Sequence, residues 1–175
     1  MRTPILDQDS AWQFINGYKK LLLEIYDGDE SSSDGIVQKL ISARKKLIGE
    51  PGLLQETQAR LAAKSEAIDP EVFQAVQGLD VRKWTYLRDT KTYSIFMDTT
   101  NRRAFGVLGL TDRLRDALGG SGVVLETGLV RYRSRFVCDG LFVRSVWLGP
   151  NYKKSFNAEF AEWKAEGRFF VNCGG

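Results

Sequence analysis

The chain has 175 residues, 27% of them charged and none of them histidine. This length fits one domain with a proper core, or one domain with a helical extension. The absence of histidine excludes Ser-His-Asp and Cys-His catalysis and removes the commonest zinc ligand. No apolar run approaches the ~20 residues of a membrane span, and the first ten residues lack the apolar core of a secretion signal. We therefore expect a cytoplasmic protein without a membrane partner.

The first part of the chain, residues 1–79, has helical patterning. Apolar side chains recur at helical spacing in three stretches, residues 10–26, 36–49 and 52–68. A fourth helix is expected from Pro70, with Asp69 as its N-cap. The acidic stretch 27–35 is expected to form an exposed loop, because its Asp, Ser and Gly residues compete for backbone hydrogen bonds.

The hydrophobic period changes after Gly78. Six aromatic and β-branched runs follow, each bounded by turn-forming residues: WTYLRD, YSIFMD, RAFGVLG, GVVLETGLVRY, RFVCDG and LFVRSVWLG. Two helices interrupt them, one in TDRLRDAL with Thr111 as its cap and one in NYKKSFNAEFAEWKAEG with Asn151 as its cap. We therefore predict an α+β fold: an antiparallel sheet with helices on one face over residues 80–175, preceded by the helical segment 1–79.

Two segments of the predicted sheet resemble each other. In each, a strand ending in Asp precedes a strand ending in Gly and then a helix, which indicates either a degenerate ββα repeat or two unrelated ββα pieces. Alternation along these strands places Phe136 and Trp147 on the inward face, so we predict that both belong to the core. Cys138 is expected to be a small buried residue of the same sheet.

Basic residues concentrate in the second part of the chain. Residues 1–79 hold 9 Lys and Arg against 12 Asp and Glu, whereas residues 80–175 hold 16 against 10, and 11 of those 16 are Arg. This asymmetry indicates an anionic partner for the second part, or electrostatic complementarity between the two parts.

The segment LVRYRSRFVCDGLFVRSV carries four candidate partner-binding residues, Arg131, Arg133, Arg135 and Arg144. On one extended strand the first three would share a face, by the period of two. If Arg133 and Ser134 instead form a hairpin turn, Arg131 and Arg135 would lie across the hairpin from each other, with Arg144 on a following strand. We expect the strand arginines to gather on one face, because a guanidinium matches carboxylate and phosphate bidentately. The alternative is a solvated sheet face, or pairing with acids of the same chain.

Three acids at expected strand ends and a helix start give a different interpretation. Asp98, Asp112 and Asp139 could together hold Mg²⁺ or act in acid–base chemistry, as in a metal-assisted enzyme. Asp is also favoured at turns and caps, and nothing in the spacing of these three residues is specific for a metal. We therefore expect no metal, no cofactor and no catalytic residue.

Two strings, AFGVLGLTDRL and YRSRFVCDGLF, resemble paired boxes in uncharacterised bacterial proteins. In those proteins a Gly-Leu-Thr-Asp helix entry precedes an aromatic-basic strand ending in Asp-Gly. The resemblance covers about a quarter of the chain and implies no activity for any residue.

The sequence thus predicts a non-catalytic interaction protein that docks an acidic or otherwise anionic partner through its arginine-rich sheet region. The alternative partner is a nucleic acid, bound by the same arginines and by aromatic residues interleaved with them. These two hypotheses differ in their expected salt dependence, which is steeper for a nucleic acid because phosphate neutralisation releases counterions. The sequence does not indicate an oligomeric state.

Overall fold

The computed structural model describes residues 3–29 and 33–174, apart from the side chains of Arg144 and Ser145. The described residues form six helices and a mixed seven-stranded sheet, so the α+β prediction is confirmed. Contacts divide the chain into two compact units, and each is described by itself. One is helical, Asp9–Gly78, and the other combines Met1–Gln8 with Leu79–Gly175.

The helical unit is built from α1 (Gln8–Ile25), α2 (Ile36–Gly49), α3 (Leu53–Ala63) and α4 (Pro70–Gln77). Asp69 caps α4 as predicted, because its Oδ1 accepts from the amides of Glu71 and Val72. The predicted loop is exposed at 27–29 and 33–35, and its middle lies outside the described residues. Within the described residues, no helix combines the length and apolarity needed to cross a bilayer.

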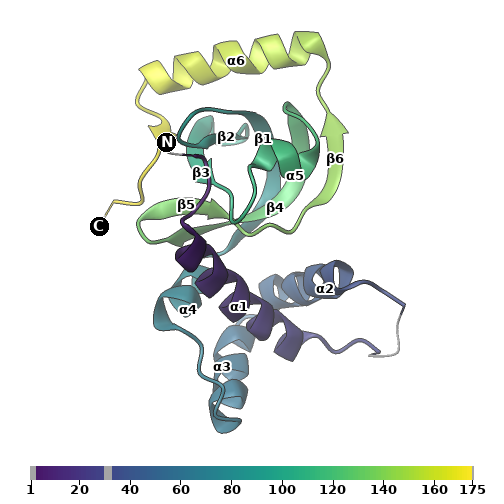
Figure 1. Cartoon of the computed structure of the whole chain (residues 1–175). Coiled ribbons are helices and arrows are strands. Elements are labelled where there is room, and N and C mark those ends of the chain that lie inside the picture. Colours follow the sequence, from purple (N-terminus) through teal and green to yellow (C-terminus); the bar gives the residue numbers. More distant parts are fainter. Residues whose placement is uncertain (1–2, 30–32, 175) are drawn as a thin grey trace. The chain divides into compact units, whose positions relative to one another are not determined.

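The second unit is a barrel (Figure 1). Its strands are β1 (Asp80–Asp89), β2 (Ser94–Asp98), β3 (Arg103–Leu108), β4 (Val123–Tyr132), β5 (Arg135–Cys138), β6 (Val143–Trp147) and β7 (Phe169–Phe170). Two helices belong to the same unit, α5 (Leu114–Leu118) and α6 (Pro150–Ala165).

Five strands close the barrel in the order β1-β2-β3-β5-β4, with β4 returning to β1. The pairing of β3 with β5 is parallel and the other four pairings are antiparallel, so the expected antiparallel sheet is right for most pairings, but the sheet is mixed and closes into a barrel. Closure depends on the ten-residue β4, which pairs with β1 along one edge and with β6 and then β5 along the other. A five-stranded Greek-key barrel with this order is the architecture of the OB-fold.

Aromatic side chains fill the inside of the barrel. Trp84, Tyr86, Phe96, Phe105 and Phe136 are buried together there, and Trp84 meets Phe105 edge to face at 5.8 Å between ring centroids. Successive inward residues on each strand are two apart, as a pleated strand requires. The prediction that Phe136 belongs to the core is confirmed, and Cys138 is buried as expected.

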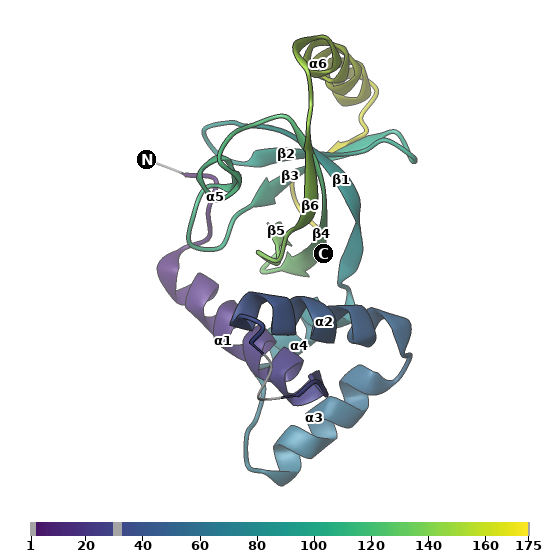
Figure 2. The ribbon, with the colours of Figure 1, turned by 90° about the vertical axis from the view of Figure 1, so that its right-hand side faces the viewer.

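Helix α6 packs on the outer face of β1, β2 and β3 (Figures 1 and 2). Ile95, Met97 and Ala104 alternate with the inward residues of these strands and pack under Phe160 and Trp163 of α6. Trp163 is 1% exposed. All five residues of β2 are therefore buried, because the strand has core on both sides.

Several local expectations are wrong. Trp147 is 51% exposed, because β6 pairs with β4 alone and projects beyond the closed barrel. The N-cap of α5 is Arg113 and that of α6 is Gly149, so neither Thr111 nor Asn151 is a cap. The two proposed ββα segments also differ in pairing: β2 and β3 form a hairpin, whereas β5 and β6 each pair with β4.

Candidate anion-binding surface at one end of the barrel

The β4–β5 hairpin carries three of the four predicted arginines. Tyr132 pairs with Arg135, which leaves Arg133 and Ser134 as a two-residue turn. Both turn residues have positive φ, 50° and 58°, as a type I′ turn requires. The hairpin interpretation is therefore right and the single extended strand is wrong. Asn-Gly is the usual sequence of this turn. Arg133 and Ser134 instead adopt the left-handed conformation at an energetic cost, because both have side chains.

The register separates the two strand arginines of this hairpin. Arg131 lies opposite Phe136, whereas Arg135 lies opposite Tyr132. Neighbouring cross-strand pairs alternate between the two faces of a sheet, so Arg131 and Arg135 point to opposite faces. The expectation that the strand arginines share one face is wrong for this pair. Arg131 has the parity of the inward residue Leu129 but lies at the strand end, where it is exposed.

The fourth predicted arginine, Arg144, lies on β6. Its neighbours Ser145 and Val143 pair with Leu125 and Glu126 of β4, and Glu126 is five residues before Arg131. That offset along β4 corresponds to about 17 Å of strand. The backbone of Arg144 is therefore distant from the hairpin, and its side chain lies outside the described part of the chain.

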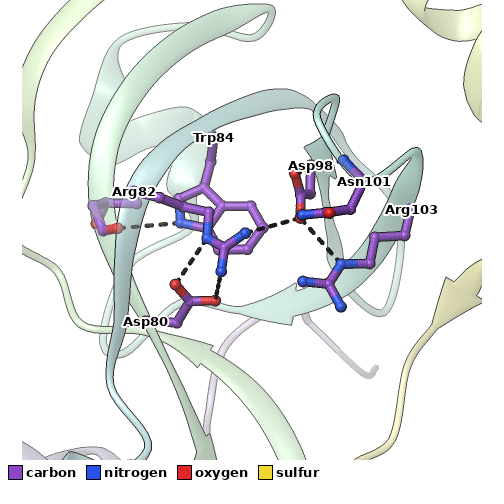
Figure 3. A network of polar contacts seen from close by, with 7 residues as sticks. Asp80, Arg82, Trp84, Asp98, Asn101 and Arg103 are labelled. Carbon is purple, nitrogen blue, oxygen red and sulfur yellow. Dashed lines mark hydrogen bonds and ion pairs between the residues drawn. The ribbon is translucent and has the colours of Figure 1, made fainter.

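Further arginines surround the same end of the barrel, where β1 and β3 begin and β2 and β4 end. We call this the arginine end and define it by Arg82, Arg102, Arg103, Arg131 and Arg133. Figure 3 shows the part of it around the buried carboxylate of Asp98. Arg82 donates from Nη1 and Arg103 from Nε to Oδ2 of Asp98, each at 3.0 Å.

Asp98 is the electrostatic anchor of this network. Its side chain is 3% exposed, and it also accepts from the Asn101 amide nitrogen Nδ2 at 2.7 Å. Burial alone would raise the pKa of this carboxyl, but hydrogen bonds from Asn101 and Arg103 and the charge of Arg82 outweigh burial and lower its pKa. Asp98 is therefore ionised near neutral pH, and it holds two guanidinium groups in place.

Arg82 is fixed from two sides. Its Nε and Nη2 donate to the two oxygens of Asp80, at 2.8 Å and 2.7 Å, which is the bidentate geometry that guanidinium favours. Its guanidinium also lies 5.2 Å from the centre of the Trp84 ring. The hydrogen bonds to Asp80 raise the pKa of Arg82 further above its usual value.

Among the described residues of the barrel unit, some arginines form ion pairs with acids, and others, including the exposed Arg113 and Arg115 near α5, do not. Arg82, Arg102, Arg103 and Arg168 each form an ion pair with an acid. Within the described residues, by contrast, no acid lies within ion-pair distance of Arg131 or Arg135. Arg133 at the hairpin tip is exposed, with its guanidinium 5.4 Å from the centre of the Tyr132 ring.

The predicted acids have separate structural settings. Asp98 ends β2 opposite Arg103 at the start of β3, and Asp139 lies two residues beyond Val137, which pairs with Leu108 at the far end of β3, so the two are about 23 Å apart along the strand direction. Oδ1 of buried Asp139 accepts from the amides of Gly128 and Leu141, so this side chain fastens the end of β5. Asp112 is exposed. In the part of the chain that the structure describes, no group of three or more His, Cys, Asp or Glu side chains could hold a metal ion.

Sequence reasoning did not single out Arg82 and Arg103 as site residues. A signal was present: Arg82 is two residues before Trp84, and Arg103 is two before Phe105, so each shares the inward parity of a core aromatic. An inward arginine at a strand end indicates a charged barrel rim. The strand order that brings these ends together is not encoded in any local pattern.

Comparison with protein-family models, curated proteins and solved structures finds no match for this chain.

Proposed function

We propose that this protein binds an acidic segment of a protein partner through the arginine end of its barrel. The observation that supports this most strongly is the contrast between anchored and unanchored arginines. Arg82 and Arg103 are held by Asp98, while Arg131 is exposed and has no acidic partner among the described residues. The anchored pair gives the surface a fixed shape and the unanchored arginine supplies charge.

The conformation of the two hairpin tips at this end supports the same proposal. Arg102 in the β2–β3 turn and Arg133 in the β4–β5 turn have φ of 51° and 50°. A residue with a side chain adopts such a left-handed conformation at a cost, so an arginine in this conformation at an exposed tip suggests a role for its side chain. Both tips lie at the arginine end, which brings two guanidinium groups beyond the strand ends.

A nucleic acid is the less favoured partner. Barrels of this architecture bind oligonucleotides on the outer face of β2 and β3, where bases stack on exposed aromatic rings. Here Phe160 and Trp163 of α6 cover that face. The exposed aromatic nearest the hairpin is Phe170, 43% exposed and two residues before Asn172, which bridges to Arg135. A single ring is a limited stacking platform for successive bases.

Charge reversal at the hairpin tests the proposal. We would compare affinity capture from extracts of the native cell by the wild-type protein and by R131E/R133E, with and without nuclease. The matched control is R113E/R115E, which makes the same change in net charge at two exposed arginines around α5. The proposal predicts a protein that is captured by the wild-type protein and the control, is lost with R131E/R133E, and resists nuclease.

Two results would contradict this. Loss of the captured protein on nuclease treatment would make the partner a nucleic acid. Equal capture by R131E/R133E and the wild-type protein would remove the arginine end as the docking surface. Thermal unfolding of both variants is measured alongside, since a lower midpoint for R131E/R133E alone would mean that these arginines serve the fold.

A further inference from the structure

A cavity of about 610 Å³ lies on the other side of the β4–β5 hairpin, outside the barrel. Its wall includes Leu108 of β3 and Arg135 of β5, which both have the outward parity of their strands. Leu108 pairs with Val137, two residues from Arg135, so the two side chains belong to neighbouring strands. This volume is within the usual range for small-molecule sites.

Three chain segments wall the cavity, and each is fastened to the barrel. The N-terminal segment is held at β3 by the amide of Leu6, which donates to the carbonyl of Gly109, and by the amide of Gly109, which donates to Pro4. The C-terminal segment is held at the hairpin by a bridge between Arg135 and Asn172. In the β1–β2 loop, the ring of Tyr93 packs against Gly106, where a Cβ atom would come within 3.0 Å of it. The walls are therefore formed before any ligand binds.

Arg135 is the cation of this cavity. Its Nε is shielded from solvent and has no hydrogen-bond acceptor among the described residues. An unsatisfied donor on a charged group is costly inside a protein, so an acceptor that reached this guanidinium would gain more than it would at a hydrated arginine. Arg135 lines the cavity, and a guanidinium can bind the two oxygens of a carboxylate through two of its nitrogens.

The remaining lining restricts the charge and shape of the ligand. Among the described residues of the lining, Asp7 is the one acid and Arg135 the one base, which disfavours a dianion such as phosphate. Ile5, Leu108 and Val171 provide apolar walls. A ligand with a single carboxylate and an apolar body matches both the charge and the apolar walls of the cavity. Thr92 and Asn172 are further polar groups of the lining.

We propose that this cavity binds a small monocarboxylate with an apolar body, and that Arg135 holds the carboxylate. The site is independent of the docking surface, because Arg131 and Arg135 point to opposite faces of the hairpin. Arg135, which the sequence grouped with the docking residues, is thereby assigned to a different site.

The test is a titration of the ¹⁵N-labelled full chain with sodium octanoate, sodium benzoate and inorganic phosphate, followed by amide chemical shifts. The proposal predicts saturable shifts at Thr92, Leu108 and Asn172 with at least one monocarboxylate and none with phosphate. R135Q should weaken binding by about tenfold or more, the loss expected for a charge-assisted hydrogen bond. R131Q, which removes the arginine on the other face, should leave the affinity unchanged.

A second variant keeps the test decisive if R135Q fails to fold. V171W fills the cavity and retains Arg135, and it should also abolish the shifts. The proposal is overturned if neither monocarboxylate binds saturably, if V171W binds as the wild-type protein does, or if phosphate shifts the same amides. It is equally overturned if a folded R135Q retains the wild-type affinity.

Discussion

Asp98 shows how one residue organises a surface. Its carboxylate is buried, yet two arginines and Asn101 lower its pKa, so its charged form belongs to the folded state. A carboxyl whose pKa is lower in the folded than in the unfolded chain stabilises the fold above its unfolded pKa, about 3.9, and this contribution is lost as pH falls through the folded pKa. The arginine end is therefore expected to be stable at neutral pH and to loosen in acid.

Replacing Asp98 with Asn tests this at residue scale. The change leaves Arg82 and Arg103 without their shared anion, and we expect it to lower the free energy of unfolding at pH 7 by about 1–3 kcal/mol. Urea unfolding at pH 7 and at pH 3 measures the effect. The difference between variant and wild type should shrink at pH 3, and a difference that is the same at both pH values would contradict the assigned role.

The buried aromatic Phe136 gives a second residue-scale prediction. Its ring lies 4.9 Å from that of Phe105 inside the barrel. Phe136→Ala should lower the free energy of unfolding by about 3–5 kcal/mol, because it leaves a cavity in a packed core. Trp147→Ala is the matched control, since Trp147 is half exposed on β6. Chemical denaturation of both variants would contradict the assignment if the two losses were equal.

At the scale of elements, the sequence of the β4–β5 turn favours partner binding at the expense of stability. Replacing Arg133 and Ser134 with Asn and Gly supplies the residues that a type I′ turn prefers. We expect the double variant to be more stable by about 0.5–1 kcal/mol, and to bind the partner more weakly because Arg133 is lost. Thermal unfolding and partner binding measure the two effects. A variant that is less stable than the wild-type protein would show that the Arg-Ser turn is not strained.

Helix α6 gives the other prediction at this scale. Trp163 seals the outer face of β2 and β3 and is 1% exposed. Trp163→Ala should lower the free energy of unfolding by about 3–5 kcal/mol, and it should expose an apolar face that binds a hydrophobic dye. If the variant retained wild-type stability and bound no dye, α6 would not be the cover of that face.

Local elements were predictable from the sequence where the signal is local. Residues 36–49 form the predicted helix because Gly35 precedes the apolar period and Gly49 and Pro51 end it. The β-like run around Phe136 and Cys138, two residues apart and so on one face of a strand, likewise predicted their burial. Trp147 has the same local pattern and is exposed, because its burial depends on which strands flank β6.

At the scale of the whole molecule, barrel closure was beyond prediction. It depends on β4 pairing with β1 across about 40 residues of chain, and loop closure over that separation leaves no local pattern. The candidate site shares this limit. Arg131 and Arg133 could be named from composition, whereas their association with Arg82 and Arg103 follows only from the order of the strands. The register of the β4–β5 hairpin separates Arg135 from Arg131.

The two units differ in charge, and the excess of basic residues in the barrel unit supports the proposal that it binds an acidic partner. The helical unit has 8 basic and 11 acidic residues, and the barrel unit has 17 and 11. An exposed ion pair contributes only about 0–1 kcal/mol, so several arginines must act together to hold an acidic partner. Binding is then expected to weaken with salt, because exposed charges are screened.

The most direct test is the fluorescence anisotropy of a labelled poly-glutamate peptide titrated with the full chain at several salt concentrations. We predict saturable binding that weakens with salt, is lost in R131E/R133E, and is retained in the control R113E/R115E. A labelled oligothymidylate of similar charge is titrated in parallel and should bind more weakly. Equal loss in both double variants would make the interaction a matter of net charge alone. It would contradict a docking surface at the arginine end, as would tighter binding of the oligothymidylate.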